Sequence, residues 1–156
     1  MQACAKLESG HMAFLIEALD RFHEDLVGAC VELLTTTRLS RSPEPSWVTC
    51  VPSTRDPELL PDFAQRLAEA LELPFAMALC RTEEREPQAS MANAVQQARN
   101  VDGAFGLCDE VTPAPVLLVD GIVGSRWTLT MTTWLLREGG CSHVWPLALA
   151  MRRSGG

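Results

Sequence analysis

The sequence contains a single lysine, Lys6, so arginine supplies nearly all of its positive charge. Acidic residues outnumber basic ones, and the formal net charge is −7. A broad nucleic-acid-binding face needs clustered basic side chains that neutralise phosphates, so this balance excludes such a face and leaves room only for a local basic patch. Arginine is also the better partner for phosphate groups, because its planar guanidinium forms two parallel hydrogen bonds.

Long apolar stretches are also missing. No run reaches the roughly 20 residues that a helix needs to cross a bilayer, and the N-terminus lacks the basic and apolar blocks of a secretory signal. Ser9-Gly10-His11-Met12 has the form of a cloning scar, so residues 1–11 are predicted to be a tag or a disordered leader. Together these features predict a cytoplasmic protein without a membrane partner.

Closely spaced metal ligands are absent as well. The six cysteines include no Cys-x-x-Cys pair, and the three histidines lie apart from the cysteines and from one another. A zinc site or a redox motif needs ligands at shorter spacing, so no metal site is assigned. Most of the cysteines stand in apolar stretches, which is typical of buried, reduced thiols in the cytosol.

The first part of the chain has helical periodicity. Apolar residues recur at helical spacing between Leu15 and Leu34, which predicts an amphipathic helix from about Met12 to Thr37 within an N-terminal region of residues 12–40. Such a helix either packs on the core of its own domain or serves as a connector or a dimer face.

The remaining region, residues 41–156, alternates between strand and helix signals. Strands are predicted at Trp47–Val51, Pro74–Leu79, Val116–Val119 and His143–Ala150, with a further strand or turn in Val101–Leu107. Helices are predicted after Asp56-Pro57-Glu58, with Asp56 as the N-cap, and from Trp127 to Gly139-Gly140. Strands that alternate with helices predict an α/β domain with a mostly parallel central sheet flanked by helices.

Two smaller expectations concern side chains. The polar segment Arg81–Pro87 is predicted to be a mobile loop, and the four tryptophans are expected in the core. Trp127 has a second interpretation, because its place at a loop–helix junction would also allow stacking on a base.

The segment Val116–Thr128 carries the main functional signal. Its apolar strand ends at Asp120, and a Gly/Ser loop then leads into the helix at Trp127. In an open parallel sheet, ligands bind at the carboxyl ends of the strands, and the free amides at a helix N-terminus suit a phosphate group.

This segment resembles the ribose-phosphate signature of type I phosphoribosyltransferases. That signature has apolar residues, two adjacent acids, three further residues, a small residue, glycine, any residue and threonine. The resemblance implies that Asp120 is the first acid and that Ser125 and Thr128 are phosphate ligands. Gly121 stands where the second acid is expected. Gly124 stands where many active members carry an acid that assists catalysis, and Arg126 replaces the loop glycine.

These replacements imply weakened chemistry and favour a non-catalytic relative. Loss of two carboxylates weakens Mg²⁺ binding and removes the obvious general base, so Mg²⁺ is expected only if phosphoribosyl pyrophosphate binds. Asp120 remains the one candidate catalytic residue if the protein is active. Arg126 either binds an anion itself or fills the pocket with its side chain, since only glycine lets the backbone close on a phosphate.

A second loop extends the resemblance. Ser53, Thr54 and Arg55 follow the first predicted strand, where the family's loop contacts pyrophosphate, and these residues supply suitable donors. The same residues are also common in ordinary turns.

The segment before the signature narrows the resemblance to the ComF-like branch. Pro87-Gln88 and Gln96–Phe105 match its Pro-Gln, its later arginine and its Asn-Val-x-Gly-Ala-Phe motif. Gln88, Arg99 and Asn100 either form a hood over a ligand or belong to a solvated loop.

The phosphoribosyltransferase-like C-terminal domain of RecQ-type DNA helicases looks closer still. It resembles this chain in Trp47–Ser53, in Asp62-Phe63-Ala64 and in Gln96–Val101. The resemblance implies a role in DNA uptake, repair or recombination, with a DNA helicase or another DNA-processing protein as partner.

Three functions compete on this basis. The favoured one is a non-catalytic module that binds a phosphoribosyl or nucleotide ligand, or a protein partner. The second is an active phosphoribosyltransferase that uses phosphoribosyl pyrophosphate. The third is an accessory domain for single-stranded DNA, whose local basic rim would be formed by Arg81, Arg85, Arg99 and Arg126.

Overall fold

The computed structural model describes residues 24–36, 43–53, 57–82, 104–108, 111–123 and 126–151. The chain forms two compact units, Met1–Ser40 and Arg41–Gly156. In the first unit, residues 24–36 are helical, as the apolar periodicity predicts. The expected start of that helix near Met12 lies outside the described residues.

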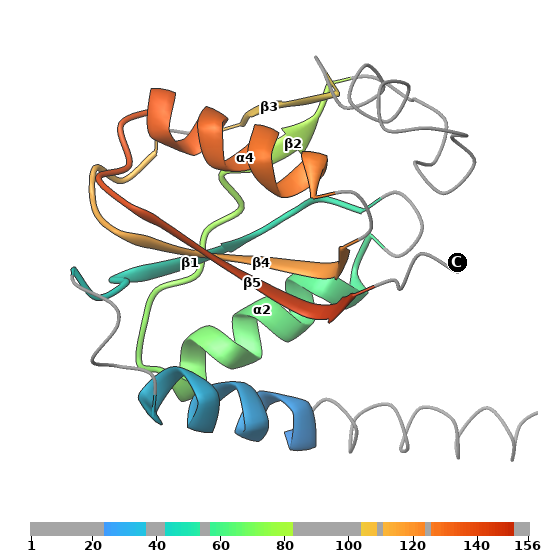
Figure 1. The fold of residues 1–156 in the computed structure, drawn as a ribbon, viewed down its shortest axis with the longest axis vertical. Coiled ribbons are helices and arrows are strands. Elements are labelled where there is room, and N and C mark those ends of the chain that lie inside the picture. The colour runs from blue at the N-terminus through green and yellow to red at the C-terminus, as the bar shows by residue number, and fades with distance from the viewer. Residues whose placement is uncertain are drawn as a thin grey trace, which may run out of the picture. The chain divides into compact units, whose positions relative to one another are not determined.

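The second unit is built on a sheet of three parallel strands in the order β1–β4–β5. These strands are β1 (Trp47–Cys50), β4 (Val116–Val123) and β5 (Val144–Met151). Trp47, the first residue of β1, lies opposite Val116, the first residue of β4. All residues of β1 and most residues of β4 are buried, as expected for a sheet that is covered on both faces. The predicted α/β class, with a parallel sheet flanked by helices, is confirmed (Figure 1).

Two helices cover opposite faces of this sheet (Figure 1). α2 (Leu59–Ala70) packs against β1 and β4, and α4 (Trp127–Glu138) packs against β4 and β5 and also against a second, smaller sheet. Gly139 follows α4, so the predicted end of this helix at the Gly-Gly pair is confirmed.

The outer edge of β1 is closed by one isolated bridge at Phe75. The Val48 amide donates to the Pro74 carbonyl at 2.9 Å, and the Ala76 amide donates to the Val48 carbonyl at 3.0 Å. The predicted strand Pro74–Leu79 is therefore wrong for most of its length. The Ala78 amide turns back to the Ala76 carbonyl at 3.1 Å, which carries the chain away from the sheet.

The smaller sheet pairs β2 (Leu79–Arg81) with β3 (Phe105–Leu107) in antiparallel orientation. Of the strand or turn expected within Val101–Leu107, β3 is the strand. Arg81, which was predicted in a mobile polar loop, is instead a half-buried strand residue whose guanidinium lies 5.0 Å from the centre of the Phe105 ring. The rest of that segment, from residue 83 on, lies outside the described residues.

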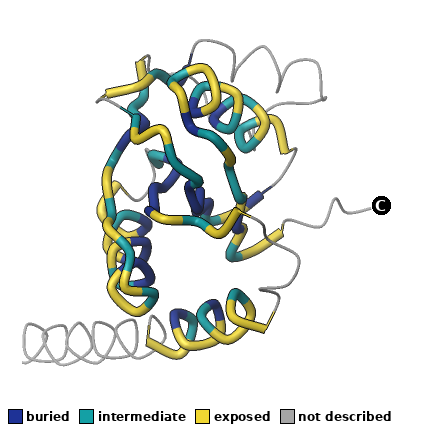
Figure 2. The backbone as a smooth tube through the Cα atoms, turned by 90° about the vertical axis from the view of Figure 1, so that its left-hand side faces the viewer, coloured by how far each residue is buried: buried dark blue, intermediate teal, exposed yellow. Residues whose placement is uncertain are grey.

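The core between the sheet and α4 contains Trp47, as predicted, together with Leu118 and Leu136. Figure 2 shows that buried positions gather in the interior of this unit and exposed positions at its surface. The expectation that all tryptophans are buried is wrong for α4, where Trp127 is 39% and Trp134 is 53% exposed. The buried residues of α4, Thr132 and Leu136, are four positions apart and face the sheet, so the tryptophans fall on other sides of the helix.

The start of α2 also differs from its prediction. Glu58, rather than Asp56, occupies the N-cap position, because Pro57 and Glu58 form a turn before the helix begins at Leu59. Asp56 itself lies outside the described residues.

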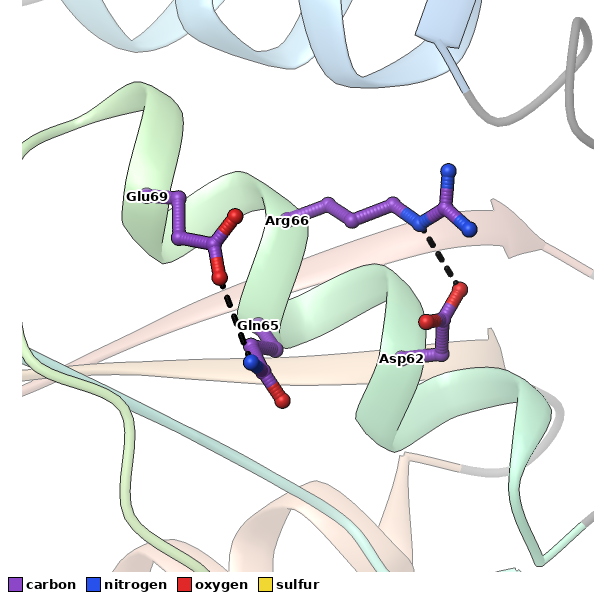
Figure 3. Close-up of polar contacts among 4 residues, drawn as sticks. All are labelled: Asp62, Gln65, Arg66 and Glu69. Carbon is purple, nitrogen blue, oxygen red and sulfur yellow. Dashed lines mark hydrogen bonds and ion pairs between the residues drawn. The ribbon is translucent and has the colours of Figure 1, made fainter.

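The solvent-facing side of α2 is held by local polar pairs. Asp62 accepts from Arg66 Nε at 2.9 Å, and Gln65 donates to Glu69 Oε1 at 3.2 Å (Figure 3). Both pairs have the four-residue spacing that adds a few tenths of a kcal/mol to a helix.

Candidate functional site

Parallel pairing brings the candidate loops to one edge of the sheet. Because β1 and β4 run in the same direction, with Cys50 opposite Val119, the segments that follow them leave the sheet at the same side. Both α2 and α4 begin at this edge (Figure 1). Such an edge is where open parallel sheets bind ligands.

The first loop enters this edge directly after β1. The Val51 amide still donates to the Val119 carbonyl at 2.9 Å, and the half-buried Ser53 follows two residues later. Thr54 and Arg55, the other two predicted pyrophosphate-loop residues, lie outside the described residues.

The signature strand is longer than its apolar run predicts. Asp120 was expected at the strand's carboxyl end, but β4 continues through Gly121 and Ile122 to Val123. The reason is tertiary, because β5 keeps pairing with β4 until Val123 lies opposite Met151. Asp120 therefore lies inside the sheet, and not on the loop.

Asp120 is the one buried acidic side chain among the described residues, with 9% of its surface exposed. Burial raises the pKa of this carboxyl, and a hydrogen bond from the backbone of Gly121 acts in the opposite direction. The balance favours the neutral acid more than in water, which makes Asp120 a poorer ligand for a hard cation.

The neighbouring Cys50 thiol stays protonated for the same reason. Burial, with a smaller contribution from the charge of Asp120, raises the pKa of Cys50 to about 12. Its Sγ lies 3.4 Å from Met77 Sδ inside the core. Cys50 is therefore a packing residue and not a nucleophile, because only the thiolate attacks.

Close packing at the Cβ position does not require a glycine at Gly121. A Cβ atom at this position would meet Leu60 Cδ1 at 3.9 Å, which is an ordinary van der Waals contact. Side chains alternate along a strand, so a residue at 121 would point toward α2, on the face opposite Asp120. A Cβ atom therefore fits at position 121, where the chain carries no side chain.

Arg126 starts α4 in an unusual backbone conformation. Its φ of 66° and ψ of −9° fall in the left-handed region that glycine favours, which is the residue that the family pattern has here. Its carbonyl accepts hydrogen bonds from the Thr130 amide at 3.0 Å and from Thr130 Oγ1 at 3.1 Å. The arginine is exposed at the amino end of the helix.

Thr128 is half-buried in the first turn of α4, and its carbonyl accepts from Thr132 Oγ1 at 2.7 Å. Gly124 and Ser125 lie outside the described residues, as do the hood residues Gln88, Arg99 and Asn100. The described part of the predicted site therefore consists of Ser53, Asp120, Gly121, Arg126 and Thr128.

Sequence patterns did not single out Arg81 as a half-buried cation. Its Nε is the one buried side-chain nitrogen or oxygen without a hydrogen-bond partner in the described part of the chain. Burial also lowers the pKa of this guanidinium. Of the predicted basic rim, the structure describes only Arg81 and Arg126, and Arg81 is occupied with the Phe105 ring.

Within the described ranges, no group of three or more histidine, cysteine, aspartate or glutamate side chains is arranged to hold a metal ion. None of the helices in the described part of the chain is both long enough and apolar enough to cross a membrane.

Replacement of Asp120 by asparagine is expected to stabilise the protein at neutral pH. Because the folded-state pKa of Asp120 is raised, the folded protein binds more protons than the unfolded chain above the unfolded pKa of about 3.9. Stability is therefore lost as the pH rises through the folded pKa, and the variant escapes this loss. Thermal unfolding between pH 4 and 8 should show Tm(variant) minus Tm(native) growing with pH. Asp25→Asn, at an exposed position, serves as the control, and a pH-independent difference for Asp120→Asn would contradict the assignment.

Neither the family models nor the curated proteins contain a match to this sequence. Among solved structures, the chain is similar to the allosteric regulatory enzyme of purine biosynthesis, with 20% identity over 71% of this chain and a TM-score of 0.49. It is similar to glutamine phosphoribosylpyrophosphate amidotransferase from B. subtilis, with 22% identity over 70% and a TM-score of 0.46. It is also similar to adenine phosphoribosyltransferase from Leishmania tarentolae, with 17% identity over 83% and a TM-score of 0.46. The chain spans 23% of the length of each of the first two chains and 55% of the third.

Proposed function

We propose that this chain is a phosphoribosyltransferase-fold module that binds a phosphate-bearing ligand at the carboxyl edge of β4 without transferring phosphoribosyl groups. The observation that carries this proposal is the pair Asp120–Gly121, a lone carboxyl group that is buried and has no second acid beside it. The resemblance of Val116–Thr128 to the ribose-phosphate signature is the reason for proposing a phosphate-bearing ligand.

Phosphate binding is supported by the start of α4. The first amides of a helix have no partner within the helix, and the helix dipole favours an anion there. Exposed Arg126 adds a positive charge at the same end, and Thr128 adds a hydroxyl group in the first turn. In this proposal the phosphate group lies against these residues, with Ser125 as a further ligand.

The proposal that the module is not catalytic is supported by the loss of two acids from this chain's version of the signature. Transfer from phosphoribosyl pyrophosphate leaves negative charge on the departing pyrophosphate, which Mg²⁺ stabilises, and carboxylates contribute by holding the Mg²⁺ ion. Gly121 and Gly124 offer no carboxylate, and burial of Asp120 favours its neutral form. Asp120 then serves as a hydrogen-bonding group for a ribose hydroxyl rather than as a metal ligand.

A place in DNA processing completes the proposal and rests on the resemblance alone. The motifs Trp47–Ser53 and Gln96–Val101 favour an association with a RecQ-type helicase or a DNA-uptake protein. With a net charge of −7, the module would receive DNA from such a partner rather than bind it alone.

Calorimetric titration with ribose 5-phosphate tests the binding half of the proposal. We expect binding that Mg²⁺ does not change, and about tenfold weaker binding by Arg126→Gly, equivalent to roughly 1.4 kcal/mol. Glycine is the matched replacement because it accommodates the left-handed backbone while removing the whole arginine side chain, including the guanidinium. Arg66→Gln, on the solvent side of α2, is the control and should bind as the native protein does.

Each other outcome of these measurements has a definite meaning. Tighter binding by Arg126→Gly would show that the arginine fills the pocket, and no binding by the folded native protein would refute the ligand. Release of pyrophosphate from phosphoribosyl pyrophosphate with any of a panel of nucleobases would replace the proposal with the active transferase.

A further inference from the structure

Among the described residues, one edge of the main sheet has no neighbouring strand. The outer edge of β1 is closed by the bridge at Phe75, whereas β5 has no second neighbour among the described residues. A strand at an open edge presents unpaired amide and carbonyl groups, which form a template for another strand.

The hydrogen bonds of β4 determine which groups of β5 face outward. The Val116 amide donates to the His143 carbonyl at 2.9 Å, and Val116 lies opposite Val144. In a parallel pair, a residue bonds to the two neighbours of the residue opposite it, so the backbone groups of Val144 point away from β4. By alternation the same holds for Pro146, Ala148 and Ala150.

The first half of this edge is blocked. Pro146 has an outward position and no amide to donate, which is where proline is tolerated in an edge strand. The neighbouring Trp145 is held by Pro43, whose carbonyl accepts from Trp145 Nε1 at 2.9 Å. Pairing with a further strand is therefore confined to the second half, where Ala148 and Ala150 are exposed.

The second half is apolar on both faces. β5 contains no charged residue, although the whole chain carries a net charge of −7. Met151 is 63% exposed, and Ile122, opposite Ala150 on β4, is 61% exposed. Side chains at these two positions point to opposite faces of the sheet because strand residues alternate, so each face has an apolar side chain beside the edge.

We infer that this edge pairs with β5 of a second copy of the chain, antiparallel about a two-fold axis at Leu149. In this register Ala148 lies opposite Ala150 of the second copy, and each such pair exchanges both backbone hydrogen bonds. In this register Pro146 is not one of the residues that form these hydrogen-bonded pairs. The two sheets of the copies become one continuous sheet.

A second copy of the chain is a favourable partner for this edge because the edge carries no charge that would repel an identical strand. A two-fold axis places the same patch on both sides, so a charged strand in this acidic chain would repel its copy. β5 has no such charge, its small alanines allow close approach, and Met151 of each copy comes to lie opposite the apolar Leu147 of the other.

Sedimentation velocity over a range of concentrations tests the association. The native chain should sediment as a dimer at micromolar concentration, and Ala148→Pro should raise the dimer dissociation constant at least tenfold because it removes an outward amide. Ala148→Ser is the matched control, since it keeps that amide and should dimerise like the native chain. A native chain that is monomeric throughout, or an Ala148→Pro dimer of unchanged affinity, would overturn the inference.

A cross-link tests the register and does not depend on how well the proline variant folds. Leu149 faces Leu149 of the second copy in a non-hydrogen-bonded pair, where Cα atoms are about 4.5 Å apart and within disulfide reach. Leu149→Cys should therefore form a cross-linked dimer under mild oxidation at least tenfold faster than Ala150→Cys, whose opposite residue is Ala148. Equal rates for the two variants, or no cross-link above that of the native cysteines, would refute this register.

Discussion

Leu118→Ala is expected to lower the free energy of unfolding by about 3 kcal/mol, within the range of 2–5 kcal/mol that is typical for truncation of a buried leucine. Leu118 is fully buried in the central strand β4, between β1 and β5, and packs in the core beneath α4. Its removal leaves a cavity that neither neighbouring strand can fill without breaking its pairing. Urea denaturation followed by circular dichroism measures the change.

Leu59→Ala provides the comparison for this variant. Leu59 begins α2 and is 44% exposed, so its truncation removes less apolar contact and should cost under about 1 kcal/mol. Similar losses for Leu59→Ala and Leu118→Ala would show that the core beneath α4 is not packed as described.

Gly139→Val is expected to destabilise the protein by about 2–3 kcal/mol, at the upper end of the range for overpacking. A Cβ at Gly139 would lie 2.7 Å from Leu107 Cδ1, 2.9 Å from Val111 Cγ2 and 3.3 Å from the Leu135 carbonyl. Leu107 is partly exposed and can move, but the branched Val111 side chain and the backbone of α4 have less freedom. The end of α4 would therefore be pushed away from β3.

Gly121→Ala is the matched control for Gly139→Val in the same unit. Its added methyl group meets Leu60 only at van der Waals distance, so the free energy of unfolding should change by less than about 1 kcal/mol. The interpretation of the α4–β3 contact fails if Gly139→Val unfolds at the same urea concentration as Gly121→Ala.

Local sequence patterns predicted the strands and helix ends correctly where the preferences of the residues agree with their tertiary environment. The uninterrupted apolar run Val116–Val119 predicted a strand buried on both faces, and β4 is central in the sheet. The turn at Gly139-Gly140 and the β-rich Trp47–Cys50 were equally informative, because these residues favour one backbone conformation over the alternatives.

Features set by distant partners could not be predicted in this way. β4 extends past Asp120 because β5 continues to pair with it, although Asp120 and Gly121 are both residue types that are depleted in strands. The exposure of Trp127 and Trp134 depends on which side of α4 meets the sheet, which weakly amphipathic spacing leaves undecided.

The environment of the candidate site could not be predicted from the motif. The motif placed Asp120 at the carboxyl end of the signature strand, whereas β4 continues to Val123, and the burial and raised pKa of Asp120 follow from the surrounding sheet. The left-handed backbone of Arg126 is likewise a property of the strand–helix junction, since arginine alone gives no reason to expect it.

The pairing of β1 with β4 also has a consequence for biosynthesis. Ser46, just before β1, bonds to Pro115, 69 residues further along the chain, so β1 cannot find its neighbour until most of the protein has left the ribosome. At the usual speed of translation this interval is roughly 3–14 seconds. During that time the edge of β1 that faces β4 is unpaired, and the nascent polypeptide is expected to depend on chaperones until β4 emerges.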